Sequence, residues 1–112
     1  MAPARKEQVA RNESIFRSMN ERLEESVKRR RSDSDLAGFV CECGDSDCEA
    51  IVRLDLATYE GIRQDSQRFF LVPGHEVADA EDVVSEGDGY LVVRKHEDVA
   101  HIAESGDGRN RD

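Results

Sequence analysis

The amino-acid sequence predicts an α+β fold: an N-terminal amphipathic helix followed by a small antiparallel-sheet domain with a structural zinc site. Three observations predict it. Apolar residues near the N-terminus recur at helical spacing, later ones alternate in short strand-like runs, and three cysteines cluster between two such runs. The chain has 112 residues, of which 38% are hydrophobic and 37% are charged, so one domain with a thin core is expected. Small domains of this kind often need a disulfide or a metal ion for stability.

The change of pattern along the chain predicts the domain organisation. Residues 1–4 are expected to form a disordered N-terminus and 32–37 a linker, on either side of a helix over 5–31. The zinc-stapled domain is expected over 38–104, and it is followed by a disordered tail over 105–112.

The N-terminal helix is predicted from one apolar stripe and a high content of good helix formers. The stripe consists of Val9, Phe16, Met19, Leu23 and Val27. Two interpretations stay open: the stripe packs on the helix's own domain, or it binds a partner helix or a second copy. Lys28-Arg29-Arg30-Arg31 ends the helix, where cations suit the negative end of the helix dipole. This basic end is interpreted as a solvated terminus, with a phosphate or nucleic-acid contact as the alternative.

Short strands and a helix are predicted in the first half of the zinc-stapled domain. A strand starting at Gly38 enters the cysteine cluster, and alternating apolar residues predict a second strand over 49–56. A short helix is expected over 57–65, with Tyr59 and Ile62 facing inward.

The second half of the domain is predicted to contain three more strands and a last helix. Thr58 is a candidate N-cap for the preceding helix. The further elements are a strand over 68–72 that ends at Pro73-Gly74, a hairpin of strands over 83–84 and 90–93 joined through Gly87-Asp88-Gly89, and a helix over 97–104.

Three cysteines form the motif C-x-C-G-x-x-x-C, which is the clearest chemical signal in the chain. The ligands would be Cys41, Cys43 and Cys48. Tetrahedral zinc needs sulfur atoms about 3.8 Å apart, and residues i and i+2 of a strand point to the same side. Gly44 is expected to allow a positive φ where the chain reverses, and Asp45-Ser46-Asp47 consists of turn formers.

Other interpretations of the cysteines stay open. Cys43 and Cys48 would fit a small disulfide that leaves Cys41 free, and three reduced thiols without a metal would also fit the spacing. However, an odd number of cysteines cannot form a complete intrachain disulfide set, and cytoplasmic thiols are normally reduced. Both points favour Zn²⁺ as the cofactor.

The fourth ligand is expected to be a histidine. His75 follows the turn residues Pro73-Gly74 and is favoured over His96 and His101, which lie near the predicted last helix. A carboxylate of the cysteine loop or a water molecule is the alternative. Four protein ligands would close the site and make it structural, whereas three ligands and water would leave the open position of a catalytic zinc.

The charge of the chain is unevenly distributed. Residues 1–31 carry 9 Lys and Arg against 5 Asp and Glu, and residues 32–112 carry 7 against 20, which gives the net charge of −9. Because nucleic-acid affinity comes largely from neutralised phosphates, the acidic body is not expected to bind nucleic acid. The acidic run over 76–88 is interpreted as a solvated loop rather than a pair of catalytic carboxylates.

The location of the protein is expected to be cytoplasmic. No apolar run approaches the roughly 18 residues that a membrane span needs, and the N-terminal residues lack the apolar region of a secretory signal. No membrane partner is therefore expected.

Two resemblances support the zinc site. The cysteine motif resembles the post-SET zinc loop of histone methyltransferases, over eight residues, which implies a loop geometry and no activity. Over roughly residues 12 to 95, the chain resembles a family of small uncharacterised actinobacterial proteins. The shared segments are Asn12-Glu13, Phe16-Arg17, Asn20-Glu21-Arg22-Leu23, Phe39-Val40-Cys41-Glu42-Cys43-Gly44, Leu54, Leu56, Tyr59-Glu60, Arg63, Pro73-Gly74-His75-Glu76 and Tyr90-Leu91-Val92-Val93-Arg94-Lys95. This resemblance implies that the helix and the cysteine domain belong together.

The function expected from these observations is that of a small non-enzymatic interaction or regulatory protein. It would act through protein–protein contacts, with a partner or with a second copy, through the N-terminal helix. No catalytic motif such as H-E-x-x-H, a phosphate-binding glycine loop or a nucleophile elbow is present. The alternatives are a DNA- or RNA-binding regulator that uses the basic helix end, and a small metalloenzyme.

Overall fold

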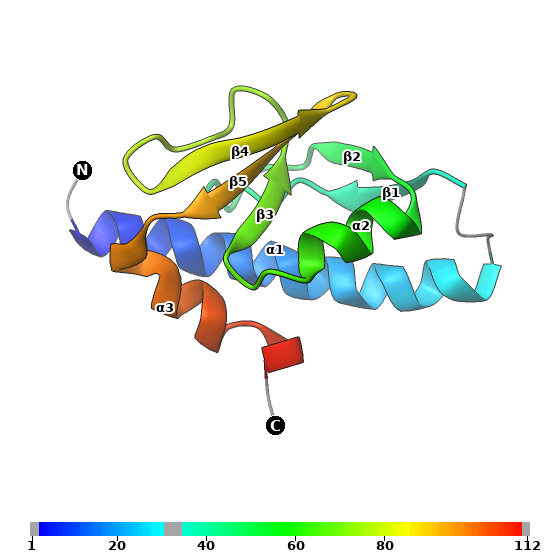
Figure 1. Cartoon of the computed structure of the whole chain (residues 1–112), viewed down its shortest axis with the longest axis horizontal. Coiled ribbons are helices and arrows are strands. Elements are labelled where there is room, and N and C mark those ends of the chain that lie inside the picture. Colours follow the sequence, from blue (N-terminus) through cyan, green and yellow to red (C-terminus); the bar gives the residue numbers. More distant parts are fainter. Residues whose placement is uncertain (1–2, 31–34, 111–112) are drawn as a thin grey trace.

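The computed structural model describes residues 3–30 and 35–110 and has an α+β fold with one long N-terminal helix and two small antiparallel sheets (Figure 1). The elements in chain order are α1 (Pro3–Arg30), β1 (Ala37–Val40), β2 (Ile51–Leu54), α2 (Leu56–Arg63), β3 (Arg68–Leu71), β4 (Glu81–Gly87), β5 (Tyr90–Lys95), α3 (Glu97–Ser105) and the 3-10 turn η1 (Gly108–Asn110). Each predicted helix and strand is therefore present. No helix in the described ranges combines the length and the apolar character that crossing a membrane requires.

The strands form two separate antiparallel sheets. β1 pairs with β2 so that Phe39 lies opposite Val52, and the second sheet has the strand order β3-β5-β4. The predicted hairpin joins β4 to β5, with Gly87 paired to Tyr90 and Gly89 at a φ of 84°. Glycine suits that position because other residues rarely adopt a positive φ.

Part of the acidic run over 76–88 is a strand and not the predicted loop. Residues 81–87 form β4, whose backbone pairs with β5. Glu81 is buried and accepts a hydrogen bond from Lys95 Nζ at 2.9 Å, and this ammonium also donates to Glu13 at 2.6 Å. The prediction failed because the partner that makes burial of Glu81 affordable comes from another strand. The remaining acidic side chains of β4 are exposed, as a solvated run requires.

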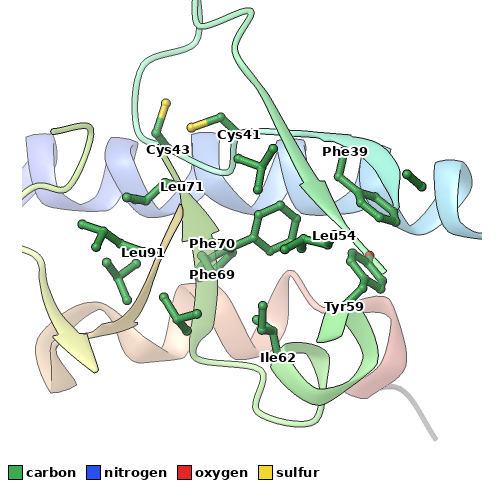
Figure 2. Packing of buried hydrophobic residues seen from close by; sticks show 14 of the residues in the cluster. Phe39, Cys41, Cys43, Leu54, Tyr59, Ile62, Phe69, Phe70, Leu71 and Leu91 are labelled. Carbon is green, nitrogen blue, oxygen red and sulfur yellow. The ribbon is translucent and has the colours of Figure 1, made fainter. Parts of the chain in front are cut away.

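An aromatic cluster holds β1, α2 and β3 together (Figure 2). The Phe39 ring stacks on Tyr59 with 4.5 Å between centroids, and Phe70 meets both rings edge-on. Tyr59 and Ile62 face inward as predicted. Helix α2 is capped by Asp55 rather than Thr58, because the Asp55 carboxylate accepts the Thr58 N–H at 2.7 Å.

Helix α1 runs along the length of the molecule and packs on its own domain (Figure 1). Val9 and Phe16 of the predicted stripe are buried, but the side chains of Met19 and Leu23 are 42% and 37% exposed. The predicted stripe is therefore wrong in its centre. The residues buried there instead are polar, and they are Glu13, Arg17, Asn20 and Glu24.

Arg17 shows how a polar side chain can be buried on this face. Its guanidinium donates to the carbonyl oxygens of Ser66 and Ala103, each at 2.6 Å, and lies 4.5 Å from the centroid of the Phe69 ring. Because buried polar groups are tolerated when they are hydrogen-bonded, the helix docks largely through specific polar contacts.

The described part of the predicted disordered tail, residues 105–110, is ordered. Asp107 is buried and pairs with Arg63 at 2.6 Å, and Arg109 forms ion pairs with Glu21, Glu24 and Glu60. The polar composition of the tail suggested disorder, but its charges find fixed partners on α1 and α2. Three stretches lie outside the described residues: 1–2, 31–34, which includes most of the predicted linker, and 111–112.

Candidate metal centre

Four side chains that can bind a metal ion meet in one cluster. They are Cys41, Cys43, Cys48 and His75, and their ligand atoms all lie within 4.8 Å of one another. The cysteines come from the loop between β1 and β2, and the histidine comes from the loop after β3. Cys41 and Cys43 are buried at the edge of the hydrophobic core (Figure 2). The four residues singled out from the sequence are thus together in space.

The distances in the cluster suit a tetrahedral ion. His75 Nδ1 lies 3.5 Å from the sulfur of Cys41 and 3.6 Å from the sulfur of Cys48. Bonds of zinc-like length to sulfur and nitrogen place two such ligand atoms about 3.6 Å apart in a tetrahedron. None of the three cysteines, all of which are described, forms a disulfide.

Local hydrogen bonds shape the cysteine loop. The Cys41 N–H donates to the Ala50 carbonyl at 3.0 Å, which extends the pairing of β1 with β2 up to the first ligand. The Asp45 carboxylate accepts the Asp47 N–H at 2.9 Å, and the Asp45 carbonyl accepts the Cys48 N–H at 3.0 Å. This turn brings the third cysteine back toward the first two, and its aspartates are exposed and lie outside the ligand cluster.

A second turn presents the histidine. The His75 N–H donates to the Val72 carbonyl at 3.0 Å, and Gly74 has a φ of 97° that favours glycine. The other histidines are not in the cluster. His96 instead pairs with Asp82 at 3.0 Å on the surface.

Gly44 is needed for a different reason than the one predicted. Its φ is not positive, since only Gly74 and Gly89 have positive φ values among the described residues. A Cβ atom at Gly44 would lie 2.6 Å from Val9 Cγ1 of α1. The missing side chain therefore lets the helix approach the cysteine loop, and Asn12 of the same helix donates to the Gly44 carbonyl at 2.8 Å.

Two residues that support the loop were not identified from the sequence. Glu42, between the first two cysteines, is fully buried; its N–H donates to the Phe70 carbonyl at 2.9 Å, and its carboxylate accepts the Phe70 N–H at 3.3 Å. Asn20 of α1 donates to the same carboxylate at 2.8 Å. The glutamate's position between two cysteines is the only local signal, and it does not reveal partners that lie 22 and 28 residues away.

The electrostatics of the cluster favour a bound cation. Burial raises the pKa of the Cys43 thiol to about 11, and the neighbouring Cys48 acts in the same direction. Burial also raises the pKa of Cys41, and the charges of Cys43 and Cys48 add to the effect. Thiolates are the metal-binding form of cysteine, so a divalent cation at the centre would compensate the charge that burial disfavours. The donor set therefore fits a metal ion.

Comparison of the chain with protein-family models, with curated proteins and with solved structures finds no match.

Proposed function

We propose that Cys41, Cys43, Cys48 and His75 hold one structural zinc ion, and that the protein is a small non-enzymatic interaction or regulatory module. The observation that carries the proposal is the set of four ligand atoms within 4.8 Å of one another. Three sulfurs and one nitrogen in tetrahedral reach are a typical structural zinc site. Soft thiolate ligands also favour zinc over magnesium or calcium, which prefer oxygen.

A structural role follows from the number of ligands. Four protein ligands fill a tetrahedron, whereas catalytic zinc keeps one position for water or substrate. Binding of zinc to such a site contributes on the order of 10 kcal/mol to folding. That contribution is large compared with the net stability of a small domain, which is about 5–15 kcal/mol.

Protein–protein contact is supported by the surface of α1. Ile15, Met19 and Leu23 are all exposed on it, and they are spaced by four residues so that they share one side of the helix. Exposed apolar side chains that form a continuous stripe mark interaction surfaces better than scattered ones do.

The nucleic-acid alternative is less well supported. Lys28 of the basic helix end lies 3.7 Å from Glu24 and 3.5 Å from Glu60, so acidic groups of the protein already neutralise it. Arg29 and Arg30 are exposed, but they stand beside a body with a strong excess of acidic residues. Phosphates would meet that excess next to the few cations available.

Cobalt substitution tests the proposed site. The cobalt(II) form is expected to show the intense visible absorption of a tetrahedral site and the near-ultraviolet charge transfer of thiolate ligands. Added azide should leave the spectrum unchanged, because no position is open to it. A six-coordinate spectrum would contradict the zinc site, and a spectrum that azide shifts would indicate an open metal and support the metalloenzyme instead.

A further inference from the structure

The outer face of α1 combines apolar and basic side chains. Ile15, Met19 and Leu23 are 60%, 42% and 37% exposed, and they span about 12 Å at the helical rise of 1.5 Å per residue. Arg22 and Arg29 are exposed on the same helix, and neither makes an ion pair within the part of the chain that the structure describes. This surface, called the basic face below, therefore has uncovered apolar groups and uncompensated positive charge.

Strand β4 combines apolar and acidic side chains. Val83 and Val84 are 49% and 43% exposed, and residues 82–87 are exposed without interruption. Glu86 adds negative charge, and Asp88 follows in the turn. β4 is an edge strand, since it pairs with β5 and with no other strand of the described residues. Residues 82–88 are called the acidic edge below.

We propose that the basic face of one copy of the protein docks on the acidic edge of a second copy. The inference rests on the proposed role in protein–protein contact and names the partner. The exposed part of β4 from Asp82 to Glu86 spans about 13 Å at a strand rise of 3.3 Å per residue, close to the length of the apolar stripe on α1. Opposite charges flank the apolar residues on the two surfaces, so apolar contact and ion pairing reinforce each other.

Charge decides which surfaces meet. Two basic faces would bring the unpaired Arg22 and Arg29 of both copies together, and two acidic edges would bring Glu86 near its counterpart. Both arrangements cost energy because like charges repel. Nucleic acid would match the arginines but would leave Ile15 and Met19 in water. An unlike pair covers both surfaces, and because each copy has one of each, two contacts close a twofold dimer, whereas single contacts produce a chain of copies.

Sedimentation of the full chain with exchanged charges tests this contact. One variant carries Arg22→Glu and Arg29→Glu, and the other carries Ser85→Lys and Glu86→Lys, all at exposed positions. Wild type is expected to associate in about 0.1 M salt, where the Debye length of about 10 Å leaves short contacts unscreened. Each variant alone should bind itself at least about ten-fold more weakly. An equimolar mixture of the two should associate again, because each new charge then meets its opposite.

The control and the contradicting results are clear. Arg53→Glu, an exposed change on β2, should leave the association intact. Wild type that stays monomeric, or a mixture that stays monomeric, would overturn the proposal, as would monomeric protein that binds a duplex DNA probe through Arg22 and Arg29. Zinc is measured in the same samples: a zinc-loaded monomer refutes only the docking, whereas a metal-free sample contradicts the proposed zinc site.

Discussion

The side-chain amide of Asn20 connects α1 to the cysteine loop. Its oxygen accepts the Val40 N–H at 2.8 Å, and its nitrogen donates to the Val40 carbonyl at 2.9 Å and to the Glu42 carboxylate at 2.8 Å. One amide thus pairs with Val40 as a neighbouring strand would, on the side of β1 that β2 leaves free. Asn20 therefore replaces a missing strand and holds the loop against the helix.

Replacement of Asn20 by alanine is expected to lower the free energy of unfolding by about 1–3 kcal/mol, because buried partners lose their hydrogen bonds. Urea denaturation measures the change. Met19→Ala, at the exposed neighbouring position, should change it by less than about 0.5 kcal/mol. Equal effects of the two substitutions would show that the amide contacts do not stabilise the fold.

Glu24 gives stability a defined dependence on pH. Burial, together with the nearby Glu60 carboxyl, raises the pKa of Glu24 to about 7 from its ordinary value of 4.5. The folded chain therefore binds this proton more tightly than the unfolded chain does. The resulting stability is complete below about pH 4.5 and is lost as the pH rises to about 7. The pKa of Glu60 is lowered to about 2, mainly by Arg109, so that carboxylate titrates in a lower range.

Glu24→Gln is expected to remove this contribution. Between about pH 5 and about pH 8, the melting temperature of wild type should fall more than that of the variant. Thermal unfolding followed by circular dichroism at both pH values compares them. Parallel changes in the two proteins would mean that Glu24 has an ordinary pKa.

The packing of α1 on the cysteine loop depends on a close approach between two elements. A Cβ atom at Gly44 would overlap Val9, with 2.6 Å to Cγ1, 3.0 Å to Cγ2 and 3.1 Å to Cβ. Real side chains essentially never approach so closely, so the helix or the loop would have to move. Val9 itself is buried, which makes this contact part of the helix interface.

Gly44→Ala is expected to destabilise the fold by about 1–3 kcal/mol through this overlap. Val9→Ala in the same chain should recover part of the loss, because it removes the methyl groups that clash. Gly61→Ala is a suitable control, since that helical glycine has no atom within 4 Å of an added Cβ and alanine favours helix by about 0.5–1 kcal/mol. Absence of any recovery in the double variant would contradict the proposed overlap.

The elements that the sequence pattern predicted are those with a local cause. Gly89 and the alternating residues before and after it defined the β4–β5 hairpin, and the spacing of three cysteines with a turn between them predicted the ligand loop. The buried face of α1 was wrong in its centre because the partners of Glu13 and Arg17 lie 49 to 86 residues further along the chain. Polar residues look solvent-exposed in a sequence until such distant partners are known.

In the whole molecule, the candidate metal centre lies where separate parts of the fold meet. Its cysteines belong to the loop that joins the two strands of the smaller sheet, and His75 follows β3 of the larger sheet. Asn12 and Asn20 attach α1 to the same loop. An ion bound to these four ligands would therefore join both sheets, and the loop that it orders would support the long helix.

The ordered tail shows the same dependence on distant contacts. Asp107 covers the buried guanidinium of Arg63, and Arg109 reaches the glutamates of α1 and α2. Together with the ligand cluster, these contacts join the first helix, the middle of the chain and its last described residues. The thin apolar core is thus supplemented by ion pairs and by the proposed zinc ion.

The most direct test is the zinc content of the purified full-length protein and two histidine variants, measured by elemental analysis. The four-ligand site predicts about one zinc per chain in wild type, about one in His101→Ala, whose histidine lies outside the cluster, and a marked loss in His75→Ala. Folded wild type without zinc, or a His75→Ala variant that retains the full amount with unchanged stability, would contradict a structural site closed by this histidine.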